Sequence, residues 1–312
     1  MGTMPKKKSM TIRRALSLVL AYIVLCVTGG VVASLLFVPA VFGANTVAKA
    51  VIPSLQVEGI DFDVASLPQQ SRMYASDGSL IATFYSQNRV VVPIKDVSEY
   101  MQKAIVARED RRFFEHSGVD VQGVMRAFIQ TYVLKRDMQG GSSLTQQYVK
   151  NVLLLQAQED NDPIAEYHAS EETVARKLRE MLIAVQMEKM YSKPEILQGY
   201  LNIAQFGSNN LYGVETAAQR YFNVHAKDLN LVQSATIAAI TKNPAGLDPS
   251  IPENQEDSEN ERNIVLKLML DQGLIEQAEY DEAVNIPLVD TLNIQSVNQG
   301  CQSAGNAAFF CS

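Results

Sequence analysis

Two polar clusters interrupt an apolar, helix-forming stretch of the sequence between residues 104 and 151. In the first cluster, Glu109 follows the apolar run of residues 104–107 and has Arg108 and Arg111 as neighbours. A carboxylate between apolar surface and cations is suited to proton transfer, because both surroundings act on its protonation. An ordinary solvated helix end is the competing interpretation, and this cluster alone does not decide between them.

The second cluster begins with Gly140 and Gly141 and continues through hydroxyl and amide side chains to Lys150. The pattern predicts a loop that runs into a helix, where free backbone N–H groups and a nearby lysine favour an anion such as phosphate. A simple loop is the alternative interpretation. An acid and an anion-binding loop about thirty residues apart indicate transfer chemistry on a phosphorylated substrate.

Two later clusters contain further charged and amide side chains. Arg176 and Glu180 are four residues apart on an expected helix, with Lys177 as a neighbour. An intrahelical ion pair worth about 0.2–0.5 kcal/mol is the simple explanation. The other cluster, residues 191–202, ends in Asn202. Taken singly, neither cluster identifies a reaction.

The elements expected around these clusters are mainly helices. Asp96 and Glu99 form a candidate capping pair for a helix that extends through about Ala107. Apolar residues at helical spacing predict a long helix from Thr173 to Tyr191, and Ser192 is the candidate N-cap of the next helix. Further helices are expected at residues 213–222, 228–241, 253–272 and 275–284.

Two further segments lie between these helices. Residues 119–136 have helical spacing, with Val124, Phe128 and Tyr132 on one stripe. This stripe belongs either to the core or to a helix that lies in a membrane interface. The acidic residues 156–172 are expected to form a mobile loop.

Short β elements are expected near both ends of the helical domain at residues 98–285. A turn at Asp77-Gly78 between β-favouring residues predicts a hairpin within residues 72–97. Residues 286–312 lose helical periodicity and are expected to be extended. The predicted fold class is therefore mainly α.

Length and composition allow a sizeable core and disfavour a nucleic-acid partner. The 312 residues are 47% hydrophobic, enough for one large domain or two smaller ones and an anchor. The net charge is −7, although five basic residues and no acidic residue lie in the first fourteen positions. Because the rest of the chain is strongly acidic, we expect no nucleic acid to bind.

Residues 15–44 form an uncharged segment of thirty positions, and about 20 apolar residues suffice to cross a bilayer. The apolar core of a cleaved signal peptide is shorter, about 7–15 residues, so we expect an uncleaved transmembrane helix. The basic tail at residues 1–14 precedes this helix. The positive-inside rule then places the N-terminus in the cytoplasm and everything after the juxtamembrane linker at residues 45–71 outside.

The cysteines and histidines give weaker information. Cys26 lies in the apolar segment, whereas Cys301 and Cys311 lie close together in the sequence. A disulfide between the latter two is compatible with an extracytoplasmic compartment, but their spacing leaves the pairing open. The three histidines are too scattered in the sequence to predict a metal site.

Taken together and in order, the four clusters resemble the successive motifs of the family 51 glycosyltransferases. The segments are EDRRFFEHSG from Glu109, GGSSLTQQYVKN from Gly140, RKLRE from Arg176 and YSKPEILQGYLN from Tyr191. Residues 262–269 are similar to a fifth motif of this family, the peptidoglycan glycosyltransferase domain of class A penicillin-binding proteins. The resemblance extends over about residues 70–285.

Parts of the sequence depart from the family pattern. Ser143 stands where the family usually has threonine, and Glu172 where some relatives have a basic residue. The sequence contains no Ser-x-x-Lys tetrad of a penicillin-binding transpeptidase domain. Residues 286–312 resemble the start of the linker to such a domain, which is missing from this sequence.

The resemblance implies a mainly α, lysozyme-like lobe with a smaller membrane-facing jaw, and a reaction that polymerises lipid II into β-1,4 glycan strands. Glu109 and Glu180 are the implied catalytic residues. Glu109 would be the general base, and Glu180 would hold a divalent cation, Mg²⁺ or Mn²⁺, or orient the basic residues. The implied substrate-binding residues are Asp110, Phe113, His116, Ser142, Thr145, Gln146, Gln147, Lys150, Asn151, Arg176, Lys177 and Asn202.

The implied partners are lipid II, the growing glycan strand and the lipid bilayer, with other cell-wall synthesis proteins as further candidates. The implied location is the cytoplasmic membrane, with the catalytic domain outside. Two alternatives remain, a lysozyme-like peptidoglycan hydrolase and an inactive cell-wall scaffold. A hydrolase does not require Lys150 or the Arg176-Lys177 pair, and the presence of both glutamates argues against the scaffold.

Overall fold

The computed structural model describes residues 60, 62–63, 66–128, 141–296, 299–301 and 311. All of them belong to one compact unit that comprises residues 57–312. The transmembrane helix expected at residues 15–44 lies outside the described residues. Among the residues that are described, no helix is long and apolar enough to span a bilayer.

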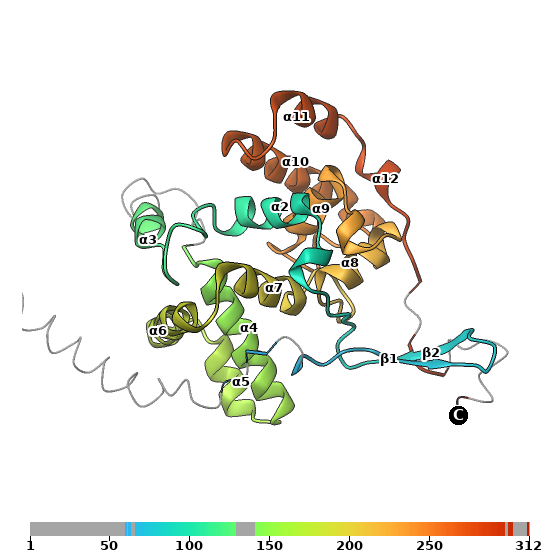
Figure 1. Ribbon diagram of the computed structural model, residues 1–312, viewed down its shortest axis with the longest axis horizontal. Helices are drawn as coiled ribbons and strands as arrows, with labels where there is room; N and C mark the ends of the chain where they lie inside the picture. The colour runs from blue at the N-terminus through green and yellow to red at the C-terminus, as the bar shows by residue number, and fades with distance from the viewer. Residues whose placement is uncertain are drawn as a thin grey trace, which may run out of the picture. The chain divides into compact units, whose positions relative to one another are not determined.

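The described part of the chain is mainly helical, as predicted, with one two-stranded sheet (Figure 1). The helices that carry or support the site are α2 (Glu99–Glu109), α3 (Val121–Phe128), α4 (Leu144–Glu159), α5 (Pro163–Ser170), α6 (Val174–Met190), α7 (Lys193–Ile203) and α8 (Val214–Phe222). The remaining helices are α9 (Leu231–Ile240), α10 (Gln255–Asp271), α11 (Gln277–Val284) and α12 (Leu288–Thr291).

Two groups of helices form the core. In the first group α9 is the central helix, because every residue from Leu231 to Ile240 except Gln233 is buried, and α2 and α10 pack against it. In the second group α4 packs against α5, α6 and α7. The end of α2 and the start of α4 therefore bring the two groups together, and this junction holds the candidate site.

The hairpin consists of β1 (Ser71–Tyr74) and β2 (Leu80–Phe84), which pair antiparallel with Ser71 opposite Phe84. The predicted turn at Asp77-Gly78 is confirmed: Asp77 Oδ1 accepts a hydrogen bond from the Ser79 N–H, and Gly78 has φ of 84°. The hairpin ends at Phe84, well before the predicted boundary at residue 97. Asn88 lies beyond the sheet and forms an isolated parallel β-bridge with Leu211.

The helix predicted before Ala107 is α2, but its N-cap differs from the prediction. Ser98, whose hydroxyl accepts a hydrogen bond from the Tyr100 N–H, is the cap. Asp96 instead ends a short 3₁₀ turn, η3 (Ile94–Asp96). The helix predicted at residues 119–136 corresponds to α3 where the structure describes it. Residues 129–136 and the side chain of Phe128 lie outside the description.

The prediction of a mobile loop at residues 156–172 was wrong. Helix α4 extends to Glu159, and α5 follows after Asp162, whose Oδ1 accepts hydrogen bonds from the Ile164 and Ala165 N–H groups. Pro163 occupies the first turn, where its missing N–H costs nothing. A local cap therefore outweighs the acidic composition from which the loop was inferred.

The later helices were predicted well. Thr173 caps α6, and the Glu195 side chain accepts a hydrogen bond from the Ser192 N–H at the start of α7. Helices α8 to α11 correspond to the four expected further helices, although residues 226–228 and 252–254 form short 3₁₀ turns, η5 and η6.

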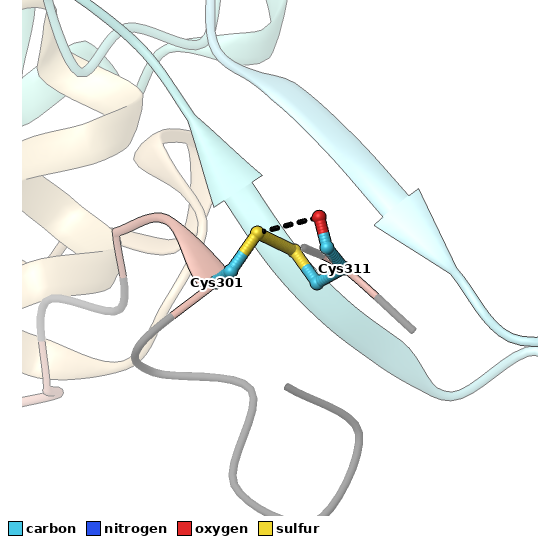
Figure 2. The surroundings of a disulfide bond; sticks show 2 residues. All are labelled: Cys301 and Cys311. Carbon is cyan, nitrogen blue, oxygen red and sulfur yellow. Dashed lines mark hydrogen bonds between the residues drawn. A yellow bond between two sulfur atoms is a disulfide. The ribbon is translucent and has the colours of Figure 1, made fainter. Parts of the chain in front are cut away.

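The extended segment predicted at residues 286–312 contains the short helix α12 and is otherwise irregular where described. It is tied to α8 by the Asn293 N–H, which donates to the Tyr221 carbonyl, and to β2 by the Gly300 N–H, which donates to the Thr83 carbonyl. Cys301 and Cys311, whose pairing the sequence left open, form a disulfide with their Cα atoms 5.2 Å apart (Figure 2).

Candidate active site

Glu109, the last residue of α2, is held by neutral hydrogen-bond donors. Its Oε2 accepts from Gln147 Nε2 on α4 at 2.8 Å, and its Oε1 accepts from Thr241 Oγ1 at the end of α9 at 2.6 Å. No described cation forms an ion pair with it. Glu109 is half-buried, so its carboxylate is fixed in orientation and still accessible.

Tyr200 sets the orientation of the Gln147 amide. The buried phenol donates to Gln147 Oε1 at 3.2 Å, which leaves the amide nitrogen facing Glu109. Burial, and next the negative charge of Glu109, raise the pKa of Tyr200 well above its usual value, so the phenol remains a donor at neutral pH. A chain of two hydrogen bonds therefore fixes one side of the Glu109 carboxylate.

Thr241 fixes the other side. Its hydroxyl lies within hydrogen-bond distance of two acceptors, Glu109 Oε1 at 2.6 Å and the Ala238 carbonyl at 2.8 Å. A hydroxyl has a single proton, and a charged acceptor binds it more strongly than a neutral one. The Thr241 proton therefore belongs to the carboxylate while Glu109 is ionised.

Glu180 on α6 has entirely different neighbours. Its side chain is buried, Arg176 pairs with Oε1, and Lys177 Nζ lies 3.1 Å from Oε2. The intrahelical ion pair expected from the sequence is thus present. Lys177 also donates to Ser142 Oγ in the glycine-containing loop. This contact joins two of the four sequence clusters, the loop and the α6 cations.

Lys150 adds a third cation. It is half-buried on α4, and no hydrogen bond or ion pair joins its side chain to another described residue. Because residues three apart on a helix share a face, Lys150 lies on the same face as Gln147, the partner of Glu109. The α4 helix therefore presents the amide that holds Glu109 and a cation on one side.

A family model described as "Transglycosylase" matches residues 77–270, which include Glu109, Lys150, Glu180 and Thr241. The chain belongs to the transglycosylase family. It is 40% identical over 221 residues to penicillin-binding protein 1A of Aquifex aeolicus, a match that covers 71% of this chain and 28% of that protein. It is 36% identical over 237 residues to penicillin-binding protein 1A of Streptococcus pneumoniae, covering 76% and 30%.

These transglycosylase relatives are much longer than the chain, which spans less than a third of their length. The crystal structure of penicillin-binding protein 1A from Haemophilus influenzae is 24% identical and matches 74% of this chain and 22% of its own. Its TM-score of 0.40 is too low to carry an argument about the fold. The sequence resemblance to the glycosyltransferase region of class A penicillin-binding proteins is confirmed by the family match.

Several residues of the first two transglycosylase motifs hold the site together. Asp110 is buried, and its Oδ2 lies 3.0 Å from the Leu144 N–H, which donates to it, and 2.9 Å from His116 Nε2. Gly118 has φ of 86°, and a Cβ atom there would lie 2.7 Å from the Ala184 backbone. Residues 110–118 are thereby attached to the start of α4 and to α6.

Other predicted substrate-binding residues point into the protein. Phe113 is fully buried, with Lys193 Nζ 4.4 Å from the centre of its ring. Thr145 donates to Glu188 at 2.5 Å, and the buried Gln146 donates to the Gly118 carbonyl at 3.4 Å. These buried side chains therefore pack in the protein interior below the motifs.

The Asn202 side chain is hydrogen-bonded to the backbone of the segment before η3. Its amide donates to the Val92 carbonyl at 2.8 Å and accepts from the Val92 N–H at 2.9 Å, and it also donates to the Gln198 carbonyl. The structure does not bring it into contact with Glu109 or Glu180. Asn151 is half-buried on α4, with no contact to the other site residues recorded among the described ones.

The sequence interpretation missed Thr241 and Tyr200 as parts of the site. Tyr200 lies inside the fourth cluster, but its helical spacing assigned it only to an apolar face. Thr241 lies 132 residues from Glu109 in the sequence and outside all four clusters. For Thr241 no local signal was available, because only the packing of α9 against α2 brings it to the carboxylate.

Proposed function

We propose that this domain is a peptidoglycan glycosyltransferase that polymerises lipid II, an undecaprenyl-pyrophosphate-linked disaccharide pentapeptide, into β-1,4 glycan strands. One observation carries the proposal: one carboxylate is held by neutral donors, and a separate group of cations lies on α4 and α6. Glu109 is the base, and Lys177, Arg176 and Lys150 form the cationic side. Glycosyl transfer from a pyrophosphate requires both.

Glu109 takes the proton of the acceptor sugar's 4-hydroxyl as that oxygen attacks the anomeric carbon of the growing chain. A sugar hydroxyl is a weak nucleophile, so a base within hydrogen-bond reach is needed. When the proton is on Oε1, the Thr241 hydroxyl accepts a hydrogen bond from it and donates to the Ala238 carbonyl, 2.8 Å away. Thr241 therefore satisfies both protonation states of the base.

The leaving group departs on the cationic side. The bond from the anomeric carbon to the pyrophosphate oxygen breaks, its electron pair stays on that oxygen, and a new bond forms to the acceptor oxygen. Lys177, Arg176 and Lys150 stabilise the developing negative charge, with Ser142 as a hydrogen-bonding partner. A single displacement inverts the anomeric carbon and needs no covalent carboxylate nucleophile.

A divalent cation at Glu180 does not fit this donor set. Mg²⁺ binds several oxygen ligands in near-octahedral geometry, whereas the two Glu180 oxygens already face Arg176 and Lys177. In the described part of the chain, no three His, Cys, Asp or Glu side chains form a metal-binding group. The proposed reaction therefore needs no metal at Glu180, and dependence on Mg²⁺ or Mn²⁺ stays a prediction for the assay.

We propose further that the helices form a lysozyme-like lobe with a smaller membrane-facing jaw. In this proposal residues 15–44 anchor the chain in the cytoplasmic membrane and the domain acts outside it. The thirty uncharged residues of this segment support the anchor. The lipid bilayer, the glycan strand and other cell-wall synthesis proteins are then the partners.

The test incubates the full chain in detergent with labelled lipid II, with and without Mg²⁺ or Mn²⁺, and separates polymer from monomer. Wild type is expected to form glycan strands, and Glu109→Gln to lose about a hundredfold or more in rate, because a positioned base contributes about 10²–10⁴-fold. Glu115→Gln is the matched control, since Glu115 is an exposed carboxylate nearby that pairs with Arg112.

Polymer formation by Glu109→Gln at the wild-type rate would overturn the base assignment. The same assay separates the two alternatives. A hydrolase would shorten preformed glycan strands without consuming lipid II, and an inactive scaffold would leave both unchanged.

A further inference from the structure

A cavity of about 340 Å³ lies between the β1–β2 hairpin, the end of α8 and the segment around residue 295. This volume is at the lower end of the range of about 300–1,000 Å³ typical of small-molecule pockets. None of the candidate active-site residues lines it. Its lining includes Arg72, Arg220 and His225 but no aspartate or glutamate, although the chain as a whole has a net charge of −7.

Tyr85 contributes a polar group without a partner to this cavity. Its hydroxyl is buried and forms no hydrogen bond. Burial raises the pKa of Tyr85, and the positive charge of Arg220 partly offsets this, so the phenol and the guanidinium are close enough to interact. A buried hydroxyl that bonds to nothing is unfavourable, and a ligand that accepts its proton would remove that cost.

Arg220 contributes a charge without a counter-ion. It is half-buried near the end of α8, and its guanidinium forms no ion pair or hydrogen bond with any described residue. Glu215, an acidic residue on the same helix, is buried and already accepts from His225 at 2.7 Å and from the Ala226 N–H at 2.7 Å. Glu215 is therefore committed elsewhere, and Arg220 is available.

We propose that this cavity binds the carboxylate of a short peptide or similar small molecule, with Arg220 and Tyr85 as its two anchoring residues. One carboxylate oxygen accepts from the guanidinium and the other from the Tyr85 hydroxyl. A single negative charge matches the single half-buried, unpaired guanidinium. The side-chain amide of Asn223 in the lining is suited to a peptide group next to that carboxylate, whereas the amide nitrogens of Gln219 and Gln295 already donate to Glu215 and Asn293.

The ligand would connect three segments that are far apart in the sequence. Tyr85 follows β2, Arg220 belongs to α8, and Gln295 lies in the segment after α12. The Gln295 N–H donates to the Arg220 carbonyl at 2.9 Å. The site does not depend on the proposed glycosyl transfer, because neither anchoring residue belongs to the Glu109 or the Glu180 side of the active site.

The test is a calorimetric titration of the full chain in detergent with N-acetyl-alanyl-alanine. The C-terminal amide of the same peptide is the matched control, because it differs only in the charge. We expect binding of the acid and not of the amide. We expect Arg220→Gln to weaken binding about tenfold or more, and Tyr85→Phe to weaken it about fivefold, as for charged and singly donated hydrogen bonds. Lys227→Gln removes an exposed cation outside the cavity and should change nothing.

Equal binding of acid and amide, no detectable heat with the acid, or unchanged binding in both variants would overturn the proposal. Inorganic phosphate is titrated in parallel, and tighter binding of phosphate than of the acid would overturn the carboxylate assignment. Because Tyr85→Phe keeps the ring, it tests the site even if Arg220→Gln does not fold. Lipid II polymerisation by each variant, expected at the wild-type rate, serves as the folding control and is read separately from binding.

Discussion

Glu109 and Glu180 are two carboxylates on two helices, and their surroundings are opposite. Both oxygens of Glu109 accept hydrogen bonds from neutral groups, Gln147 and Thr241. Both oxygens of Glu180 face cations, Arg176 and Lys177. The charge of Glu109 is not paired with any described cation, whereas the charge of Glu180 is balanced by two cations that it also holds in place. Because the surroundings of the two carboxylates differ, we propose different tasks for them.

The comparison between the two carboxylates can be tested by mutation. After Glu109→Gln, the largest effect is expected when a positive charge beside Glu180 is removed. Lys177→Met keeps the length of the side chain and removes its contacts to Glu180 and Ser142. We expect kcat/KM for lipid II polymerisation to fall about a hundredfold, the loss typical for one group that stabilises developing charge. The measurement is the initial rate of polymer formation.

Lys189→Met is the control, because Lys189 is exposed on the same helix and far along it from Glu180. Arg176→Ala and Lys150→Ala should lower the rate in the same direction with the fold intact by circular dichroism. Wild-type kinetics in all three active-site variants would remove the pyrophosphate assignment of this cluster.

Two substitutions at Thr241 test how the hydrogen bond to Glu109 affects the reaction. Thr241→Val removes the hydroxyl that bonds to Glu109 and keeps the shape, whereas Thr241→Ser keeps the hydroxyl. We expect kcat to fall about tenfold in the valine variant with KM little changed, since a hydrogen bond to a charged group is worth about 1.5–3 kcal/mol. The serine variant should recover most of the loss.

We expect Thr241 to act as a positioning residue, because its hydroxyl bonds to Glu109. A purely structural role would predict similar behaviour for the valine and serine variants. Equal rates in the two variants would therefore count against it.

The smallest expected effect concerns Tyr200 and is read as stability against pH. Burial and the Glu109 charge raise the pKa of Tyr200 in the folded protein. The protonated Tyr200 phenol contributes fully to the free energy of unfolding below the pKa of tyrosine in the unfolded chain, about 10. This contribution is lost as the pH rises towards the pKa of Tyr200 in the folded protein, because the unfolded chain releases the proton first. Tyr200→Phe cannot show this loss.

We therefore expect Tyr200→Phe to be about 1 kcal/mol less stable at pH 8, because the hydrogen bond to Gln147 is gone. The difference from wild type should narrow as the pH rises from about 9 to 11. Urea unfolding at each pH measures it. Tyr221, whose pKa burial also raises, titrates in both proteins and cancels. A difference that stays constant or widens would contradict the assignment.

What the sequence could predict is governed by the range of the interactions involved. Thr173 and Ser192 were recognisable as helix starts because a cap and the N–H groups it serves are only a few residues apart. Arg176 and Glu180 were recognisable as a pair for the same reason. Helix α5 was missed because the acidic composition of residues 156–172 outweighed the Asp162-Pro163 start.

The long-range contacts were not accessible in this way. No spacing rule connects Thr241 with Glu109, or Lys177 with Ser142, because tertiary packing alone brings them together. Asn202 shows a long-range contact of another kind. Its place in a family motif predicts a substrate contact, which stays a prediction, and its amide is hydrogen-bonded to the Val92 backbone.

The close approach of Gly118 to the Ala184 backbone joins two parts of the candidate site. Main chain meets main chain there without an intervening side chain, and the Ser143 hydroxyl donates to the Gly118 carbonyl at 2.6 Å. The segment that follows Glu109 and the helix that carries Glu180 therefore cannot slide independently. A backbone contact therefore fixes the separation of Glu109 and Glu180, and a side chain at position 118 would force these two segments apart.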